Sequence, residues 1–191
     1  MNAWIGPAIV AAVISSIVSA FGWYVSWRTT VGLEKLRRAE KVRDFQIALR
    51  AEIRSELHNL QSHDSSAILE GVRERYRSEP GYSVLVPRPV NHTVYTALVP
   101  ELHLLPEAVI DPIILYYRQR DTIENLVADI RDDTFRSLAP DRQLAMYEDY
   151  LKLRSVLEQL AQGAIGALER SLNNSVAGLS GRKSASADPK A

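Results

Sequence analysis

Hydrophobic and polar positions divide the chain into one continuous apolar stretch and a longer amphipathic remainder. The stretch comprises residues 4–27 and contains no charged side chain. A helix of 24 residues, at about 1.5 Å per residue, extends roughly 36 Å and exceeds the ~30 Å hydrocarbon core of a bilayer. We therefore expect a single N-terminal transmembrane helix, within an anchor of residues 1–30.

Aromatic residues mark both ends of this stretch. Trp4 begins it, and Trp23, Tyr24 and Trp27 end it. Indole and phenol rings settle at the membrane–water interface, so both ends are typical of interfacial positions. A cleavable signal peptide would carry a positive segment before the apolar run, and no basic side chain precedes Trp4. The pattern thus favours an uncleaved signal anchor.

Basic residues follow the stretch and none precede it. This basic cluster comprises Arg28, Lys35, Arg37, Arg38, Lys41 and Arg43. Positive charge stays on the cytoplasmic side of a span. We expect a single-pass protein of the plasma (bacterial inner) membrane, with its N-terminus outside and its C-terminal body cytoplasmic. The cluster either contacts anionic membrane lipids as well or only sets the orientation.

Small residues recur every fourth position along the stretch. The possible helix-packing stripe is Ala8, Ala12, Ser16 and Ala20. Small side chains let two membrane helices approach closely. Self-association into a homo-oligomer through this stripe is therefore one hypothesis.

Beyond the stretch, apolar positions recur with helical periodicity. In residues 31–61 one face carries Val42, Phe45, Leu49, Ile53, Leu57 and Leu60. The heptad is not sustained, so packing in a bundle is favoured over a coiled coil. Gly32 is the one weak point between this helix and the apolar stretch.

The same periodicity predicts helices over residues 66–77, 92–98, 106–132 and 140–173. Residues 82–90 should form an irregular segment. The third of these helices either bends or begins at Pro112, because Asp111-Pro112 is a helix-start pattern. The tail has too few apolar residues to fold, so residues 175–191 should be disordered. The expected fold is all-α: the membrane helix is followed, over residues 31–174, by an antiparallel helical bundle with long helices and short connecting ones.

Composition and charge exclude several classes of function. The 191-residue chain has no cysteine, which excludes disulfides, thiolate nucleophiles and cysteine-based metal sites. Residues 28–54 hold eight basic and four acidic residues, whereas residues 99–170 hold eight basic and thirteen acidic ones. This polarity is typical of a protein at a membrane surface and argues against a nucleic-acid partner.

The inventory of catalytic motifs is small. The sequence has no phosphate-binding loop, dinucleotide fingerprint or serine elbow. Gly163 and Gly166, in the last predicted helix, indicate a close helix–helix contact. His58 and His63 are five residues apart, which does not suit a helical metal pair. His92 and His103 flank a short helix and show no carboxylate partner nearby in the sequence.

Two further clusters have structural interpretations. The acidic patch comprises Glu124, Asp129, Asp132 and Asp133. Two of these carboxylates could share a cation, but a solvated face is favoured, with Arg120 and Glu124 as a helical pair. The patch is alternatively a docking face for a basic partner or for the chain's own basic cluster. At helical spacing one tyrosine of each neighbouring pair, Tyr116–Tyr117 and Tyr147–Tyr150, faces the core. We predict no cofactor, no metal and no catalytic residue.

Residues 94–98, 104–107 and 114–117 carry a loose pattern of a short helix, a Leu-Leu-Pro cap and a helix bearing tyrosines. This pattern resembles one in uncharacterised bacterial single-span membrane proteins with a helical cytoplasmic body. The resemblance implies the same architecture and carries no function.

Three hypotheses of function follow. The first is a non-enzymatic, membrane-anchored component that binds a protein partner or acts as a scaffold at the cytoplasmic face. The second is a self-associating membrane component that acts through its span. The third is an enzyme or ligand sensor with a site among His92, His103 and the tyrosines.

Overall fold

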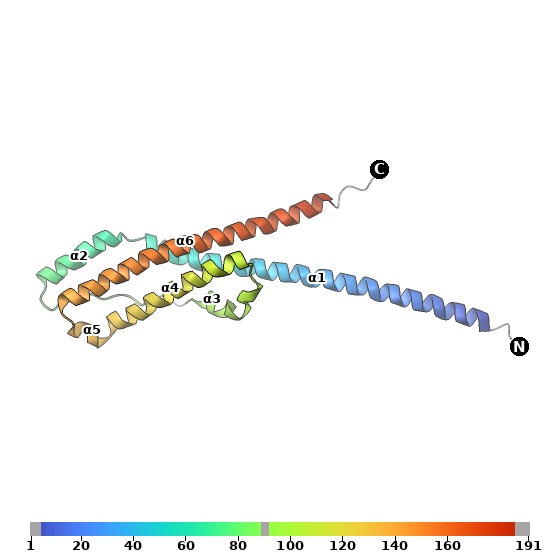
Figure 1. Ribbon diagram of the computed structural model, residues 1–191, viewed down its shortest axis with the longest axis horizontal. Coiled ribbons are helices and arrows are strands. Elements are labelled where there is room, and N and C mark those ends of the chain that lie inside the picture. Colours follow the sequence, from blue (N-terminus) through green and yellow to red (C-terminus); the bar gives the residue numbers. More distant parts are fainter. Residues whose placement is uncertain (1–4, 89–91, 186–191) are drawn as a thin grey trace. The chain divides into compact units, whose positions relative to one another are not determined.

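The computed structural model describes residues 5–88 and 92–185, and the side chains of residues 15–16, 18–88 and 92–175. Throughout these ranges the chain is helical or irregular, with no strand. The all-α class is therefore confirmed. In order, the helices are α1 (Ile5–Gln61), α2 (Ser65–Ser78), α3 (Thr93–Leu98), the 3₁₀ helix η1 (Val99–Leu104), α4 (Glu107–Arg131), α5 (Asp133–Ser137) and α6 (Pro140–Ala185) (Figure 1).

Two compact units make up the chain, Met1–Asp44 and Phe45–Ala191. The first consists of the N-terminal part of α1, and none of its described side chains is buried. Of the helices that the structure describes, none is long and apolar enough to cross a membrane, so the predicted span gains no support from it. Trp4 and the side chains of residues 5–14 and 17 lie outside the described part of that span.

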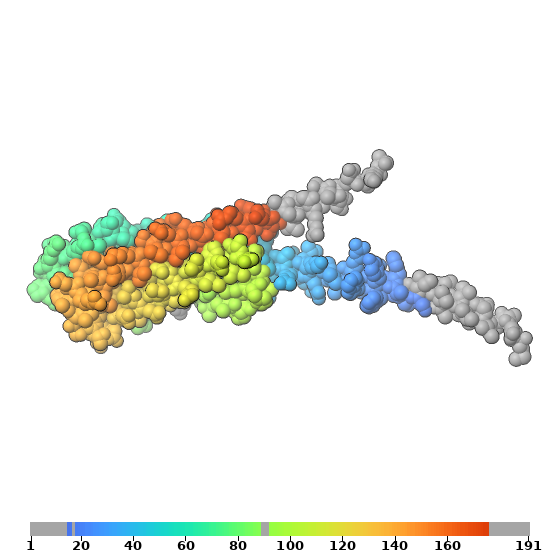
Figure 2. Space-filling model, in the orientation of Figure 1, coloured from blue at the N-terminus to red at the C-terminus, as the bar shows by residue number. Residues whose placement is uncertain are grey.

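The second unit is a helical bundle around α6. Gln46 of α1 bonds Ser171, and Gln61 bonds Glu158, so α1 and α6 run in opposite directions. From Phe45 onward, α1 runs alongside α6 in the same direction as α2 and α4 (Figure 1). The surfaces of α4 and α6 meet along the bundle in the space-filling view (Figure 2). A helical bundle is therefore confirmed, with α6 antiparallel to its neighbours.

The apolar faces expected from periodicity form the core of this unit. Leu57, Leu126, Leu144 and Leu160 are half-buried at its edge. The buried residues of the predicted faces are Leu49, Ile53 and Leu60 in α1, Val109, Ile113, Ile123, Val127 and Ile130 in α4, and Tyr147, Leu151, Leu157, Ala164, Leu168 and Leu172 in α6.

Two helices continue through the weak points that the sequence indicated. α1 passes Gly32 without a break, and the hydroxyls of Thr29 and Thr30 bond helix carbonyls one turn earlier. α4 begins at Glu107 rather than at Pro112. Pro112 lies beyond the first turn of α4, where N–H groups normally bond carbonyls of the preceding turn, so its missing N–H costs one backbone hydrogen bond.

The segment between α2 and α3 is irregular but packed, as predicted, over residues 82–88. Val84 and Val86 are buried while Leu85 is exposed. The alternation is strand-like, yet the backbone pairs with side chains: Val84 N–H donates to the Tyr76 hydroxyl, and Arg131 donates to the Val86 carbonyl. These bonds replace the neighbouring strand that the segment lacks.

The region around α6 differs from prediction in three places. A short helix, α5, precedes it, capped by Asp132, which accepts from Thr134 N–H, and anchored by the buried Phe135. α6 itself continues to Ala185 rather than ending at residue 173, because no proline interrupts the sequence there. A side chain at Gly163 would meet no atom within 4 Å, so the expected close helix–helix contact at this glycine is wrong.

Candidate functional site

The N-terminal unit presents large apolar side chains to its surroundings. Val18, Phe21, Trp23, Tyr24, Val25 and Trp27 are between 44% and 73% exposed. Successive helical residues point in different directions, so this apolar surface surrounds the helix instead of forming one stripe. A helix that is apolar all round is typical of a buried or membrane-spanning element, and not of a helix in water.

The other residues singled out in this unit are also exposed. The basic residues Arg28, Lys35, Arg37 and Arg38 directly follow the apolar surface along α1. Tyr24 and Trp27 lie beside one another, with ring centroids 6.5 Å apart. The structure describes only two side chains of the small-residue stripe, Ser16 and Ala20, and both are exposed; the side chains of Ala8 and Ala12 lie outside the described residues.

Within the bundle, one carboxylate joins three elements. Glu52 of α1 accepts hydrogen bonds from the backbone N–H groups of Val94 (2.9 Å) and Tyr95 (3.1 Å) and from the Tyr117 hydroxyl (2.6 Å). The first two bonds satisfy backbone donors at the start of α3, where no side chain of the helix itself provides a cap. Glu52 thereby attaches α3 to α1 and α4.

Aromatic rings surround this carboxylate. Tyr95 stacks on Tyr117 with ring centroids 3.6 Å apart, and the His92 ring lies 5.6 Å from Tyr117. Burial, followed by the hydrogen bond to Glu52, raises the pKa of Tyr117 above its ordinary value of 10.0. Burial likewise raises the pKa of Tyr116. Both phenols therefore stay neutral at physiological pH, and Tyr117 remains a donor to Glu52.

The prediction of one core-facing tyrosine per pair is wrong. Tyr116 and Tyr117 are both buried, and so are Tyr147 and Tyr150. Tyr147 and Tyr150 are three residues apart and therefore share one face of α6. Tyr116 and Tyr117 are adjacent, and both are buried because α4 packs against α6 and is also bonded to α1 through Glu52.

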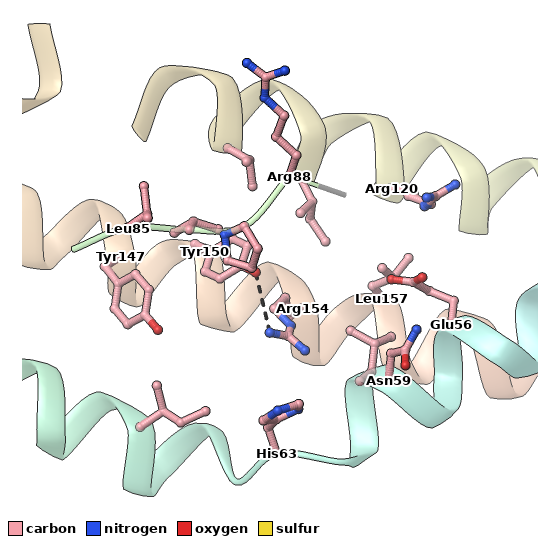
Figure 3. Close-up of a pocket in the computed structure, with 16 residues that line it drawn as sticks. Glu56, Asn59, His63, Leu85, Arg88, Arg120, Tyr147, Tyr150, Arg154 and Leu157 are labelled. Atoms are coloured by element: carbon pink, nitrogen blue, oxygen red, sulfur yellow. Dashed lines mark hydrogen bonds between the residues drawn. The ribbon is translucent and has the colours of Figure 1, made fainter. Parts of the chain in front are cut away.

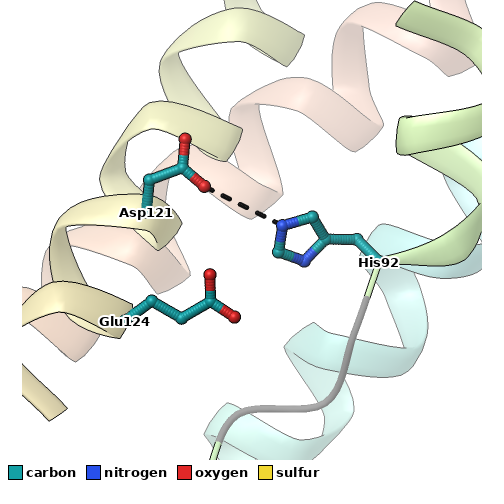
Figure 4. Close-up of side chains that lie close together, drawn as sticks. All are labelled: His92, Asp121 and Glu124. Carbon is teal, nitrogen blue, oxygen red and sulfur yellow. Dashed lines mark ion pairs between the residues drawn. The ribbon is translucent and has the colours of Figure 1, made fainter. Parts of the chain in front are cut away.

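His92 lies opposite two carboxylates of α4. Its Nε2 is 3.8 Å from Asp121 Oδ1, and one ligand atom from each of His92, Asp121 and Glu124 lies within 4.8 Å of the others. Figure 4 shows the imidazole and both carboxylates facing the same space. Imidazole nitrogen and carboxylate oxygen are ligands for divalent transition metals. Sequence reasoning missed this set because Asp121 and Glu124 belong to a different helix.

The remaining candidates do not gather at one site. His103 is exposed, and its Nδ1 lies 3.1 Å from the Pro100 carbonyl of its own helix. In the acidic patch, Asp132 caps α5 and Asp133 pairs with Arg136, whereas Glu124 faces His92. Hydrogen bonds from the hydroxyl and then the N–H of Thr134 lower the pKa of Asp132.

A pocket lies between α1, α2, α4 and α6. This pocket has a volume of about 450 Å³, and its lining includes Leu60, His63, Arg120, Tyr150 and Arg154. Figure 3 shows Arg154 beside Tyr150, whose hydroxyl accepts a hydrogen bond of 3.4 Å from Arg154 Nη1.

Comparison with protein-family models, with curated proteins and with solved structures finds no match to this chain.

Proposed function

We propose that the chain is a non-enzymatic, membrane-anchored protein whose helical bundle binds a protein partner at the cytoplasmic face. The main support for a membrane anchor is the exposed apolar surface of the N-terminal unit. Each large apolar side chain left in water forgoes roughly 1.5–3 kcal/mol of transfer free energy. Six such side chains, from Val18 to Trp27, are at least 44% exposed, so a bilayer around them would be strongly stabilising.

The orientation of the proposed anchor follows from charge. The uncharged stretch of residues 4–27 is bounded on its C-terminal side by Arg28, Lys35, Arg37 and Arg38. Basic residues next to a span remain cytoplasmic, and they also attract anionic lipid headgroups.

The nature of the partner follows from the charge of the bundle. Residues 99–170 hold thirteen acidic and eight basic residues, so we expect the partner to present a basic surface. Apolar side chains such as Leu85 and Leu115, which are 71% and 55% exposed, are available for contact. Site-specific photocrosslinking from these two positions in native membranes should recover the partner, and the same crosslinker at the exposed Leu33 of the N-terminal unit should not.

Charged substitutions in the apolar surface test the anchor. Val18→Lys lies near the middle of the proposed span, where a lysine costs about 2.5–3.5 kcal/mol of insertion free energy. Phe21→Lys lies nearer the C-terminal end of the span and adds a smaller cost. The native chain should stay in membrane pellets after alkaline carbonate extraction, and the double variant should appear in the supernatant.

The matched control is Leu115→Lys with Val156→Lys, which also replaces two exposed apolar residues, but in the bundle. This control should remain in the pellet. Release of the native chain by carbonate, or retention of the Val18→Lys, Phe21→Lys variant, contradicts the anchor.

A further inference from the structure

We propose that His92, Asp121 and Glu124 form a binding site for one divalent transition-metal ion, which links the start of α3 to α4. The proposal does not depend on the membrane anchor or on a protein partner.

The fold brings the three ligands together from two elements. His92 immediately precedes α3, where the bonds from Glu52 to Val94 and Tyr95 hold the backbone in place. Asp121 and Glu124 are three residues apart in α4 and therefore lie on one face of that helix. The ligand atoms are within 4.8 Å of one another, and all three side chains face a common space (Figure 4).

The His92 ring supplies an observation that is independent of the carboxylates. Its side chain is only 13% exposed, and its buried Nδ1 has no hydrogen-bond partner among the described residues. The 3.8 Å from Nε2 to Asp121 is also too long for a hydrogen bond. A buried polar atom without a partner costs free energy. Nε2, which faces Asp121 without a hydrogen bond, is the ring nitrogen free to coordinate a metal ion.

The two carboxylates add an electrostatic reason. Like charges at this helical spacing repel one another, and a divalent cation between them would convert that repulsion into attraction. Asp121 is 61% exposed, so its side chain is able to rotate toward the ion. This rotation is needed because bonds of about 2.0–2.2 Å to each ligand bring the ligand atoms closer together than they are now.

The chemistry of the three ligands determines which metal ions fit the site. One imidazole and two carboxylates suit Zn²⁺, Mn²⁺ or Fe²⁺, whereas Ca²⁺ and Mg²⁺ prefer oxygen alone. Three protein ligands leave at least one coordination position open. A pocket of about 480 Å³, lined by His92, Thr93, Thr96, Ala97 and Glu124, adjoins the site. It provides room for a water molecule or a small anion at the open position.

Zinc titration of the purified full chain tests the site. We expect isothermal calorimetry to show one Zn²⁺ site and the thermal unfolding midpoint to rise with Zn²⁺ concentration. Asp121→Asn and Glu124→Gln should each weaken Zn²⁺ binding by about tenfold or more. His92→Gln should abolish the thermal shift.

Exposed residues of the same types provide matched controls. Asp129→Asn, on the same helix, and His103→Gln should bind Zn²⁺ as the native chain does. Because His92 packs against Tyr117, folding of His92→Gln is checked by circular dichroism. If that variant fails to fold, the surface variant Asp121→Asn decides the outcome. Equal Zn²⁺ affinity in native protein and Asp121→Asn, or weakened binding in His103→Gln instead, would overturn the proposal.

Discussion

Glu52 shows how much of the bundle depends on single polar side chains. Its carboxylate is the shared acceptor for two N–H groups of α3 and for the hydroxyl of Tyr117. A second example is Gln143, which is 4% exposed; it accepts from the Tyr76 hydroxyl and donates to the Leu138 carbonyl. Such side chains hold the short segments that apolar packing alone does not position.

Removing the charge of Glu52 should loosen α3. Glu52→Gln keeps the shape of the side chain but replaces one acceptor oxygen with a donor, so at least one of the three bonds is lost. We expect the free energy of unfolding to fall by about 1–3 kcal/mol. Hydrogen exchange at Val94 and Tyr95 should become faster.

The control for this substitution is Glu74→Gln in α2. Glu74 is exposed and pairs only with Arg77, at 3.6 Å, so the change should be below about 1 kcal/mol. If Glu52→Gln and Glu74→Gln were equally stable, Glu52 would have no special part in holding α3.

The sequence alone could not predict contacts between residues that lie far apart along the chain. Periodicity identifies Glu52 only as a polar residue within a predicted helix, and it says nothing about Tyr117, which lies far along the chain. The same holds for His92, whose neighbours Asp121 and Glu124 come from α4. A sequence pattern reports which residues share a face of one helix, but not which faces meet.

At the scale of elements, capping and periodicity predicted most helices well. The helix expected over residues 66–77 is α2, Ser65–Ser78, and Asp64 caps it by accepting from Ser66 N–H. The five-residue helix α5 was missed, because an element this short shows no periodicity and depends on the burial of Phe135. The end of α6 was placed too early, since Asn173-Asn174 lowers helix propensity without stopping a helix.

Glycines in the helices allow a test of the packing. Because a methyl group at Gly163 would meet open space, Gly163→Ala should stabilise the bundle by about 0.5–1 kcal/mol through helix propensity. Thermal or urea unfolding measures this change.

The control glycine lies just after α2. Gly81 has a φ of +82°, a conformation that alanine adopts with strain, so Gly81→Ala should destabilise the protein. A loss of stability in Gly163→Ala would instead indicate the close helix contact that the structure does not contain.

The two units of the molecule differ in whether their apolar side chains are buried or exposed. The unit from Phe45 to Ala191 buries leucine, isoleucine and tyrosine among its helices. The unit from Met1 to Asp44 has no buried side chain among those described, although its helix carries exposed valine, phenylalanine and tryptophan. The sequence predicted this contrast, because an uncharged stretch and an amphipathic one have different hydrophobic patterns.

Thiol labelling tests membrane insertion and orientation at once. The chain has no cysteine, so an introduced cysteine is the only reactive thiol. Asn2→Cys precedes the proposed span, and Ser155→Cys replaces an exposed residue of the bundle.

Each variant is expressed in bacteria and treated with a membrane-impermeant maleimide, before and after the inner membrane is disrupted. Asn2→Cys should react in intact cells, and Ser155→Cys should react only after disruption. Labelling of Ser155→Cys in intact cells, or protection of both thiols until disruption, would contradict the proposed insertion and orientation.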